Sequence, residues 1–134
     1  MDYEEMIKYR DENNPYASHL GIITTEIRPG YAKGELVLEP YHINAVGSVH
    51  GGCIFSLADT MGGAAAASYG TRCTTISSDF HYLSAAIGNK KLVSTASEIK
   101  HGKTIRVYDI DVRDENDRLI AKGIFSYYNL GTPL

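Results

Sequence analysis

The stretch GGCIFSLADTMGGAAAAS, residues 51–68, decides how this chain folds. Its apolar residues cover nearly every face of a helix: Ile54, Phe55, Leu57, Ala58, Met61 and Ala64 to Ala67. A helix that is apolar all round is a buried helix, so other elements must surround it. The pattern therefore predicts one long central helix over this stretch.

Strand patterns stand on both sides of this helix. Residues 21–27 and 32–38 predict two strands with a turn at Pro29-Gly30 between them. Four more strands are expected after the helix, at about 73–84, 91–100, 104–114 and 118–129. The spacing of apolar residues over 2–12 predicts a short N-terminal helix that ends before Pro15, and 41–50 is predicted to be an irregular loop.

This order of elements predicts an α+β fold in which an antiparallel sheet wraps around the one long central helix. We expect the N-terminal helix within residues 1–14 and the main domain over 15–134, because a chain of 134 residues fits a single domain. A sheet of this kind has edges to cover. Dimerisation that continues the sheet is one simple solution.

Composition excludes several classes of partner. The formal charge of -3 and the pI near 5.9 argue against nucleic acid, which requires a basic face. Residues 51–70 could cross a bilayer by length, but Asp59 near the middle argues against a membrane span. No signal peptide is evident, the two cysteines form no C-x-x-C pair, and the histidines show no metal-ligand spacing. We therefore expect a cytoplasmic protein with reduced thiols and no metal.

Asp59 is the only charged residue between His50 and Arg72. Removing a carboxylate from water is costly unless it gains partners or its pKa rises. The central helix has no other polar residue larger than Ser or Thr, which gives little sign of a hydrated face. A functional carboxylate is one interpretation, and an Asp on a single wet edge of the helix is the other.

The start of the same helix, His50-Gly51-Gly52, is a second candidate. The first N–H groups of a helix lack intrahelical acceptors, and glycine lets a ligand oxygen approach them, although Gly-Gly also occurs in ordinary helix-entry turns. Gly51 and Asp59 are eight residues apart, about 12 Å along a helix. They can act on one substrate only if they come from two subunits, so a shared site requires at least a dimer.

The chain resembles the hot-dog thioesterase superfamily, in particular its phenylacetate-pathway (PaaI-type) branch. The similarity covers about residues 17–130 and rests on NAVGSVHGG (44–52), LAD (57–59), TISSDFHYLS (75–84) and KHGKT (100–104). It implies a hot-dog fold and hydrolysis of a small or aromatic acyl-CoA to free acid and CoA. It further implies no cofactor and a homodimer, with two dimers forming a tetramer.

The resemblance also implies roles for single residues. Asp59 would be the nucleophile or the general base, and Gly51 would donate its N–H to the thioester carbonyl. Asn44 and His50, from the same subunit as Gly51, would orient that carbonyl and the sulfur. Thr75, from the Asp59 subunit, would hold the attacking water. A thioester carbonyl has little resonance stabilisation, so one carboxylate and one oxyanion contact can suffice.

The remaining expected substrate contacts are Gly52, Ser77, Tyr82, Leu83, Ser84, Lys100, His101, Gly102 and Lys103. Ser77 is the alternative to Thr75 beside the aspartate. Tyr82 and Leu83 would line the acyl pocket or simply pack in the core. The segment from Lys100 to Lys103 would bind CoA phosphates or form a solvated hairpin tip.

Three alternatives follow from the same residues. A non-catalytic acyl-CoA-binding module gains nothing from a costly carboxylate. An enoyl-CoA hydratase usually pairs a histidine with a carboxylate on the central helix, but His50 is two turns from Asp59. Cys53 is three residues from His50, yet a buried Cys is more often a small hydrophobic residue than a nucleophile.

Overall fold

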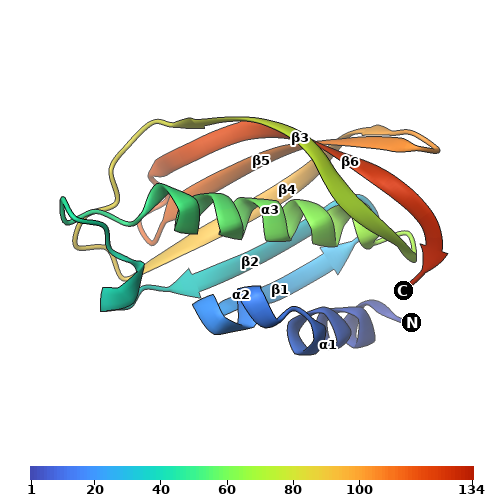
Figure 1. Ribbon diagram of the computed structural model, residues 1–134, viewed down its shortest axis with the longest axis horizontal. Helices are drawn as coiled ribbons and strands as arrows, with labels where there is room; N and C mark the ends of the chain where they lie inside the picture. Colours follow the sequence, from blue (N-terminus) through green and yellow to red (C-terminus); the bar gives the residue numbers. More distant parts are fainter.

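The computed structural model describes residues 1–134 and places a single long helix, α3 (Gly51–Ala67), in the concave face of a six-stranded sheet (Figure 1). The strands are β1 (Ile22–Arg28), β2 (Tyr31–Val37), β3 (Thr71–Tyr82), β4 (Lys91–His101), β5 (Ile105–Asp114) and β6 (Leu119–Pro133). The other helices are α1 (Tyr3–Asn13), α2 (Pro15–Leu20) and the 3-10 turn η1 (Pro40–His42). No helix is long and apolar enough to span a membrane.

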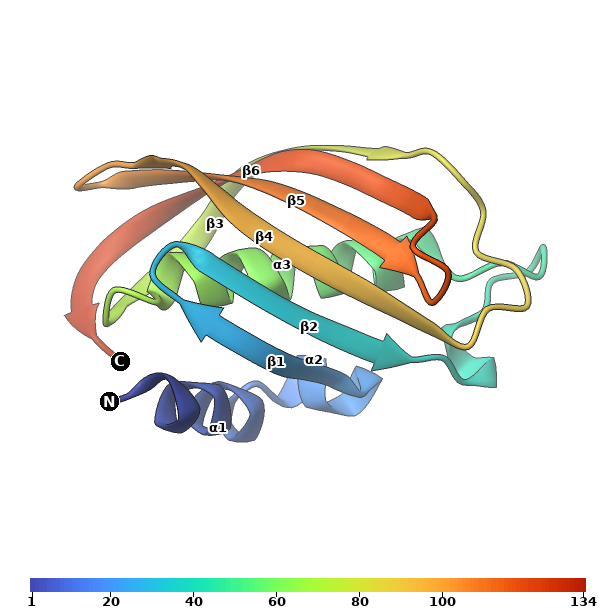
Figure 2. The same cartoon turned by 180° about the vertical axis from the view of Figure 1, so that it is seen from behind.

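The strand order is β1-β2-β4-β5-β6-β3, and every neighbouring pair is antiparallel. Seen from behind, β2, β4 and β5 pass across α3, while α1 and α2 lie beside β1 (Figure 2). The predicted α+β architecture, a sheet wrapped around one helix, is confirmed. Because β3 pairs only with β6, its other edge is free.

The core fills the space between α3 and the sheet. Leu57, Ala58 and Met61 on the helix are fully buried, as are Phe125 and Tyr108 on the strands. Small residues let the layers approach closely. Positions 55, 56, 59, 60 and 63 of α3 are only half-buried and form one stripe along the helix, so the all-round burial predicted from the apolar pattern holds for the rest of the helix from Cys53 on but not for this stripe.

The first helix ends at Asn13, before Pro15, as predicted, but the structure has a second helix that was not predicted. Pro15 does not simply end the first helix but begins a second one, α2, because proline lacks the N–H that the first helical position leaves unpaired. The side chain of Asn14 caps this helix by accepting a hydrogen bond from the Ala17 N–H at 3.3 Å. The strand β3 ends at Tyr82, two residues earlier than expected.

Candidate active site

Asp59 lies half-buried on α3, at a groove of about 360 Å³ on the protomer surface. The residues that line this Asp59 groove are Arg10, Asn14, Tyr16, Phe55, Ser56, Asp59, Thr60, Gly63, Cys73, Thr74, Thr75 and Tyr127. Asp59 is the only carboxylate among them, and no histidine is present. No group of three His, Cys, Asp or Glu side chains in the protein could hold a metal ion.

The two carboxylate oxygens of Asp59 have different environments. Oδ1 accepts hydrogen bonds from Thr75 Oγ1 at 2.7 Å and from the Tyr127 hydroxyl at 3.1 Å. The same hydroxyl lies 3.1 Å from the backbone oxygen of Asp59. Oδ2 accepts no hydrogen bond from the protein, so it is free to act on a molecule in the groove.

Pairing of β3 with β6 places both hydroxyls. Thr75 and Tyr127 are cross-strand partners, and neighbours of this kind project from the same face of a sheet. The register shifts directly after Thr75, so Ser77 pairs with Ser126, one residue before Tyr127. Ser77 therefore points to the face away from α3, and of the two candidate hydroxyl residues it is Thr75 that contacts Asp59.

Tyr127 is a site residue that the sequence did not reveal. It is only 1% exposed, and burial together with the negative charge of Asp59 raises its pKa well above the usual value. The phenol therefore stays protonated and serves as a donor. Its hydroxyl occupies the space beside Gly62, where any Cβ would collide with it.

The helix start holds the second group of expected residues. His50 Nδ1 accepts a hydrogen bond from the Gly52 N–H at 2.8 Å, so a neutral His50 carries its proton on Nε2. The Gly51 N–H donates to no protein atom, whereas the Gly52 N–H is used by this cap. Tyr82 donates its hydroxyl to the Gly51 oxygen at 2.8 Å and braces the turn from β3.

A second groove, of about 330 Å³, lies at this end of α3. The residues that line this Gly51 groove are Asn44, Ser48, Val49, Gly51, Ile54, Tyr82, Leu83, Ser84, Ala85 and Ala86. Asn44 Oδ1 accepts from the Val46 and Ser48 N–H groups, both at 3.0 Å, and so shapes the preceding loop. In one protomer the expected catalytic residues thus form two separate groups, one at each groove.

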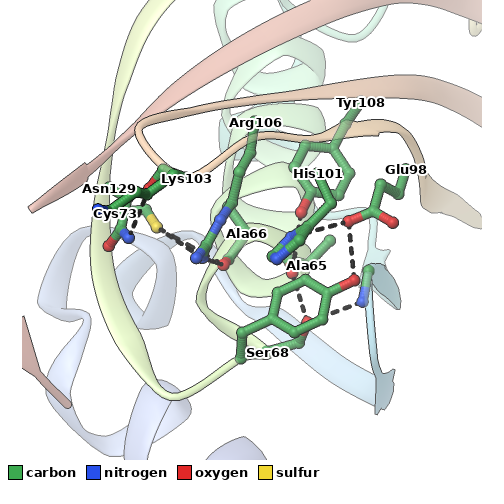
Figure 3. A network of polar contacts seen from close by, with 12 residues as sticks. Ala65, Ala66, Ser68, Cys73, Glu98, His101, Lys103, Arg106, Tyr108 and Asn129 are labelled. Carbon is green, nitrogen blue, oxygen red and sulfur yellow. Dashed lines mark hydrogen bonds and ion pairs between the residues drawn. The ribbon is translucent and has the colours of Figure 1, made fainter. Parts of the chain in front are cut away.

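The hairpin from Lys100 to Lys103 lies near the opposite, C-terminal end of α3. His101 Nδ1 lies 3.3 Å from Glu98 Oε1, and Arg106 donates to the Ala66 carbonyl at 2.7 Å (Figure 3). Lys100 and Lys103 are exposed and form no ion pair. The exposed His101 side chain is therefore engaged by Glu98, while the two lysines leave free cations at the hairpin.

Comparisons with known proteins identify the family of the chain. The family model described as "Thioesterase superfamily" matches residues 46–121. A putative esterase from Archaeoglobus fulgidus is 35% identical over 88% of this chain and 77% of its own length. Acyl-coenzyme A thioesterase 13 from Homo sapiens is 30% identical over 89% of this chain and 88% of its own.

A solved structure has the same fold. The PaaI protein of the phenylacetic acid degradation operon of E. coli superposes with a TM-score of 0.92 at 26% sequence identity, covering 96% of this chain and 94% of that one. By sequence, acyl-coenzyme A thioesterase PaaI from Escherichia coli is 30% identical over 82% of this chain and 79% of its own length.

Proposed function

Because this chain belongs to the thioesterase superfamily and shares the hot-dog fold of its PaaI-type members, we propose that it hydrolyses a small or aromatic acyl-CoA to free acid and CoA. One observation carries the proposal. Asp59 has one oxygen held by two hydroxyl donors and the other oxygen free at a groove. A carboxylate held in this way is oriented for reaction and keeps a lone pair for it.

The chemistry needs only this carboxylate, water and an oxyanion donor. Oδ2 of Asp59 can remove a proton from a water that attacks the thioester carbon, or attack that carbon itself and be released by water. In either route the carbon–sulfur bond breaks, the CoA sulfur leaves as a thiolate that takes up a proton, and the acid is freed. The developing negative charge on the carbonyl oxygen requires a donor near 3 Å.

The oxyanion donor in this proposal is the N–H of Gly51 of the partner subunit. Two observations support a site between subunits. The Asp59 and Gly51 grooves are separate within one protomer, and the outer edge of β3, which carries Thr75 and most of the exposed polar residues next to the site, is unpaired. A homodimer that pairs β3 with its symmetry mate would extend the sheet and bring unlike grooves together.

The remaining contacts of the proposed substrate follow from the free groups. Lys100 and Lys103 would bind CoA phosphates, since they are unpaired cations on a chain that is acidic overall. His101 would support the hairpin rather than bind phosphate, because Glu98 already engages it. Asn44 and the Nε2–H of His50 would hold the thioester group. Tyr82, Leu83 and Ser84 also line the Gly51 groove and would contact the part of the substrate next to the thioester.

The proposal is tested with Asp59→Asn, which keeps the shape of the side chain and its contact with Thr75 but removes the charge. We expect kcat for release of CoA thiol to fall at least about 100-fold, the scale of losing one general base. Circular dichroism and gel filtration should show an unchanged fold and assembly. Wild-type thiol release by this variant would refute the proposal.

A hydratase on the same fold would need a histidine that transfers a proton to an alkene. No histidine of the same protomer lines the Asp59 groove, and in the proposed dimer the Nε2–H of His50 of the partner subunit is a donor to the thioester group. An enoyl-CoA ester incubated with the wild-type enzyme should therefore release thiol and accumulate no hydroxyacyl-CoA.

A further inference from the structure

Arg10 is a cation that the catalytic proposal does not use. It reaches from α1 across α3, where its Nη2 lies 3.4 Å from the Thr60 oxygen and faces Gly63. Its Nε is sealed from solvent without a partner, Nη1 donates to no protein atom, and no carboxylate lies within ion-pair distance. Burial lowers the pKa of Arg10, but a guanidinium remains charged in a protein.

Arg106 is the other arginine whose Nε is sealed from solvent, but its guanidinium has a strong acceptor. It donates to the Ala66 carbonyl at 2.7 Å and so binds the negative end of the α3 dipole (Figure 3). Arg10 has only one long contact with a carbonyl. Its nearest charged neighbour in sequence, Asp11, instead accepts a hydrogen bond from Thr24 at 3.0 Å. Arg10 is thus a half-buried cation, with a sealed Nε, that lacks a strong acceptor.

A pocket of about 350 Å³ adjoins the Asp59 groove at Arg10. The two hollows share four lining residues, Arg10, Asn14, Cys73 and Thr74, so they adjoin along this wall. An acyl group whose thioester carbon lies at Asp59 would reach the Arg10 pocket by passing Thr74 and Cys73.

Two of the side chains that line the Arg10 pocket, Arg10 and Arg72, are cations. Arg72 lines it and forms no ion pair, and no Asp or Glu side chain is among the lining residues. Asn14 adds a free amide donor, because its Oδ1 caps α2 while its Nδ2 donates to no protein atom. Two guanidinium groups and an amide are a donor set for a carboxylate, which can accept from Arg in a bidentate manner.

We propose that the Arg10 pocket binds a carboxylate at the far end of the acyl group, so that the preferred substrates are CoA monothioesters of dicarboxylic acids. This inference rests on the proposed hydrolysis at Asp59, and it narrows the substrate class. A neutral hydrocarbon end would leave the guanidinium of Arg10 without an acceptor, at a desolvation cost that a carboxylate removes.

The test compares esters that differ only at the distal end. Glutaryl-CoA and pentanoyl-CoA have the same number of acyl carbons, one ending in a carboxylate and the other in a methyl group. We expect wild-type kcat/KM to favour glutaryl-CoA, and Arg10→Met to reduce the glutaryl-to-pentanoyl ratio roughly 10- to 100-fold, the effect of losing a hydrogen bond to a charged group. Arg72→Met should reduce the ratio less, because Arg72 is exposed.

Lys8→Met is the matched control, since it removes an exposed cation from the same helix outside the pocket. It should leave the ratio unchanged. Arg10→Lys keeps the charge and should retain part of the preference. If Arg10 only braced α1 against α3, Arg10→Met would slow both esters equally, and an unchanged ratio overturns the inference. So does a wild-type enzyme that prefers pentanoyl-CoA.

Binding separates this inference from the proposed function. In the Asp59→Asn background, calorimetry measures the dissociation constants of both esters without turnover. Tighter binding of glutaryl-CoA that disappears with Arg10→Met supports the pocket even if the wild-type enzyme released no thiol, in which case hydrolysis alone is refuted. Equal binding of the two esters refutes the pocket whatever the rates are.

Discussion

Thr75 and Tyr127 face each other across β3 and β6 and donate to the same carboxylate oxygen of Asp59. Their shared target fixes the orientation of the carboxylate and directs the other oxygen to the groove. Both donors come from the sheet, whereas the acceptor comes from the helix. The packing of α3 on the sheet is therefore also what aligns the reactive group.

This arrangement predicts non-additive effects of removing the two hydroxyls. Thr75→Val and Tyr127→Phe should each lower kcat about 10-fold or more, because a hydrogen bond to a charged group contributes about 1.5–3 kcal/mol. Since the remaining donor still holds Oδ1, the double variant should lose more than the product of the single effects. Steady-state thiol release from all four proteins completes the double-mutant cycle.

Ser126→Ala is the control for this cycle. Ser126 is adjacent to Tyr127 on β6 and pairs with Ser77, on the face of the sheet away from α3. Its replacement should leave kcat unchanged. Strictly additive losses at Thr75 and Tyr127 would mean that the two hydroxyls act independently and do not share the task of orienting Asp59.

Gly62 is predicted to be essential for the position of Tyr127. A Cβ at Gly62 would collide with the Tyr127 hydroxyl and with Cδ1 of Ile110. Ala normally stabilises a helix interior by about 1 kcal/mol relative to Gly, but overpacking costs about 1–3 kcal/mol. We therefore expect Gly62→Ala to lower both kcat and the midpoint of thermal unfolding.

Gly63→Ala is the matched comparison for stability, one residue further along the same helix. Its Cβ would lie 3.3 Å from Nη2 of Arg10, the mobile end of a long side chain that can shift slightly. Its unfolding midpoint should equal or exceed that of the wild type. Equal midpoints for the two variants would show that Tyr127 does not require the space at Gly62.

The central features of the site could be predicted because they break a local pattern. Asp59 is a single charge on an apolar helix, and His50-Gly51-Gly52 precedes that helix directly. Tyr127 breaks no pattern. It is followed by Tyr128, and only the register between β3 and β6 decides which of the two faces α3.

Long-range packing also determines the features that the sequence did not reveal. Thr75 could be separated from Ser77 only with knowledge of the register shift that follows Thr75. Arg10 belongs to a short helix with weak amphipathic character, and the direction of its side chain towards Thr60 of α3 depends on how α1 packs beside β1. Pro15 fits either the end of one helix or the beginning of the next, and the cap by Asn14 decides for the beginning.

Alkaline pH should destabilise the protein through its buried phenols. Burial raises the pKa values of Tyr127 and Tyr108 well above the ordinary value near 10. A raised pKa means that the folded state holds the proton more tightly. Each phenol with a raised pKa therefore stabilises the folded state below pH 10, and this contribution declines as the pH rises towards the pKa of the phenol in the folded state.

Denaturant unfolding between pH 8 and pH 11 measures this decline. Tyr127→Phe should be less stable than the wild type at pH 8 but show a smaller loss of unfolding free energy above pH 10. Tyr3→Phe removes an exposed phenol and should leave the slope of the wild type. If the unfolding free energies of the wild type and Tyr127→Phe fell equally with pH above pH 10, the Tyr127 phenol would not contribute to the pH dependence of stability.

Gly51→Pro is predicted to remove the oxyanion donor without disturbing the fold. Gly51 is the first residue of α3, where proline is well tolerated, and its N–H has no protein acceptor to lose. His50 has φ -58° and ψ 132°, an extended conformation that suits a residue before proline. We expect kcat to fall about 100- to 1000-fold with little change in unfolding midpoint.

Gly51→Ala is the control for the added carbon, because it keeps the N–H while its Cβ meets the same Tyr82 ring at 3.3 Å. It should retain most of the activity. If Gly51→Pro were as active as Gly51→Ala, the carbonyl oxygen would have to be held by another group.

Mixing the two inactive variants tests whether the site spans two subunits. A dimer of one Gly51→Pro chain and one Asp59→Asn chain contains one site with both groups intact and one with neither. Random exchange makes half of the dimers mixed, so activity should recover to about a quarter of the wild-type value in a symmetric dimer. If Asp59 and Gly51 of the same protomer acted together, every chain in the mixture would lack one of the two groups. Mixing would then restore no activity.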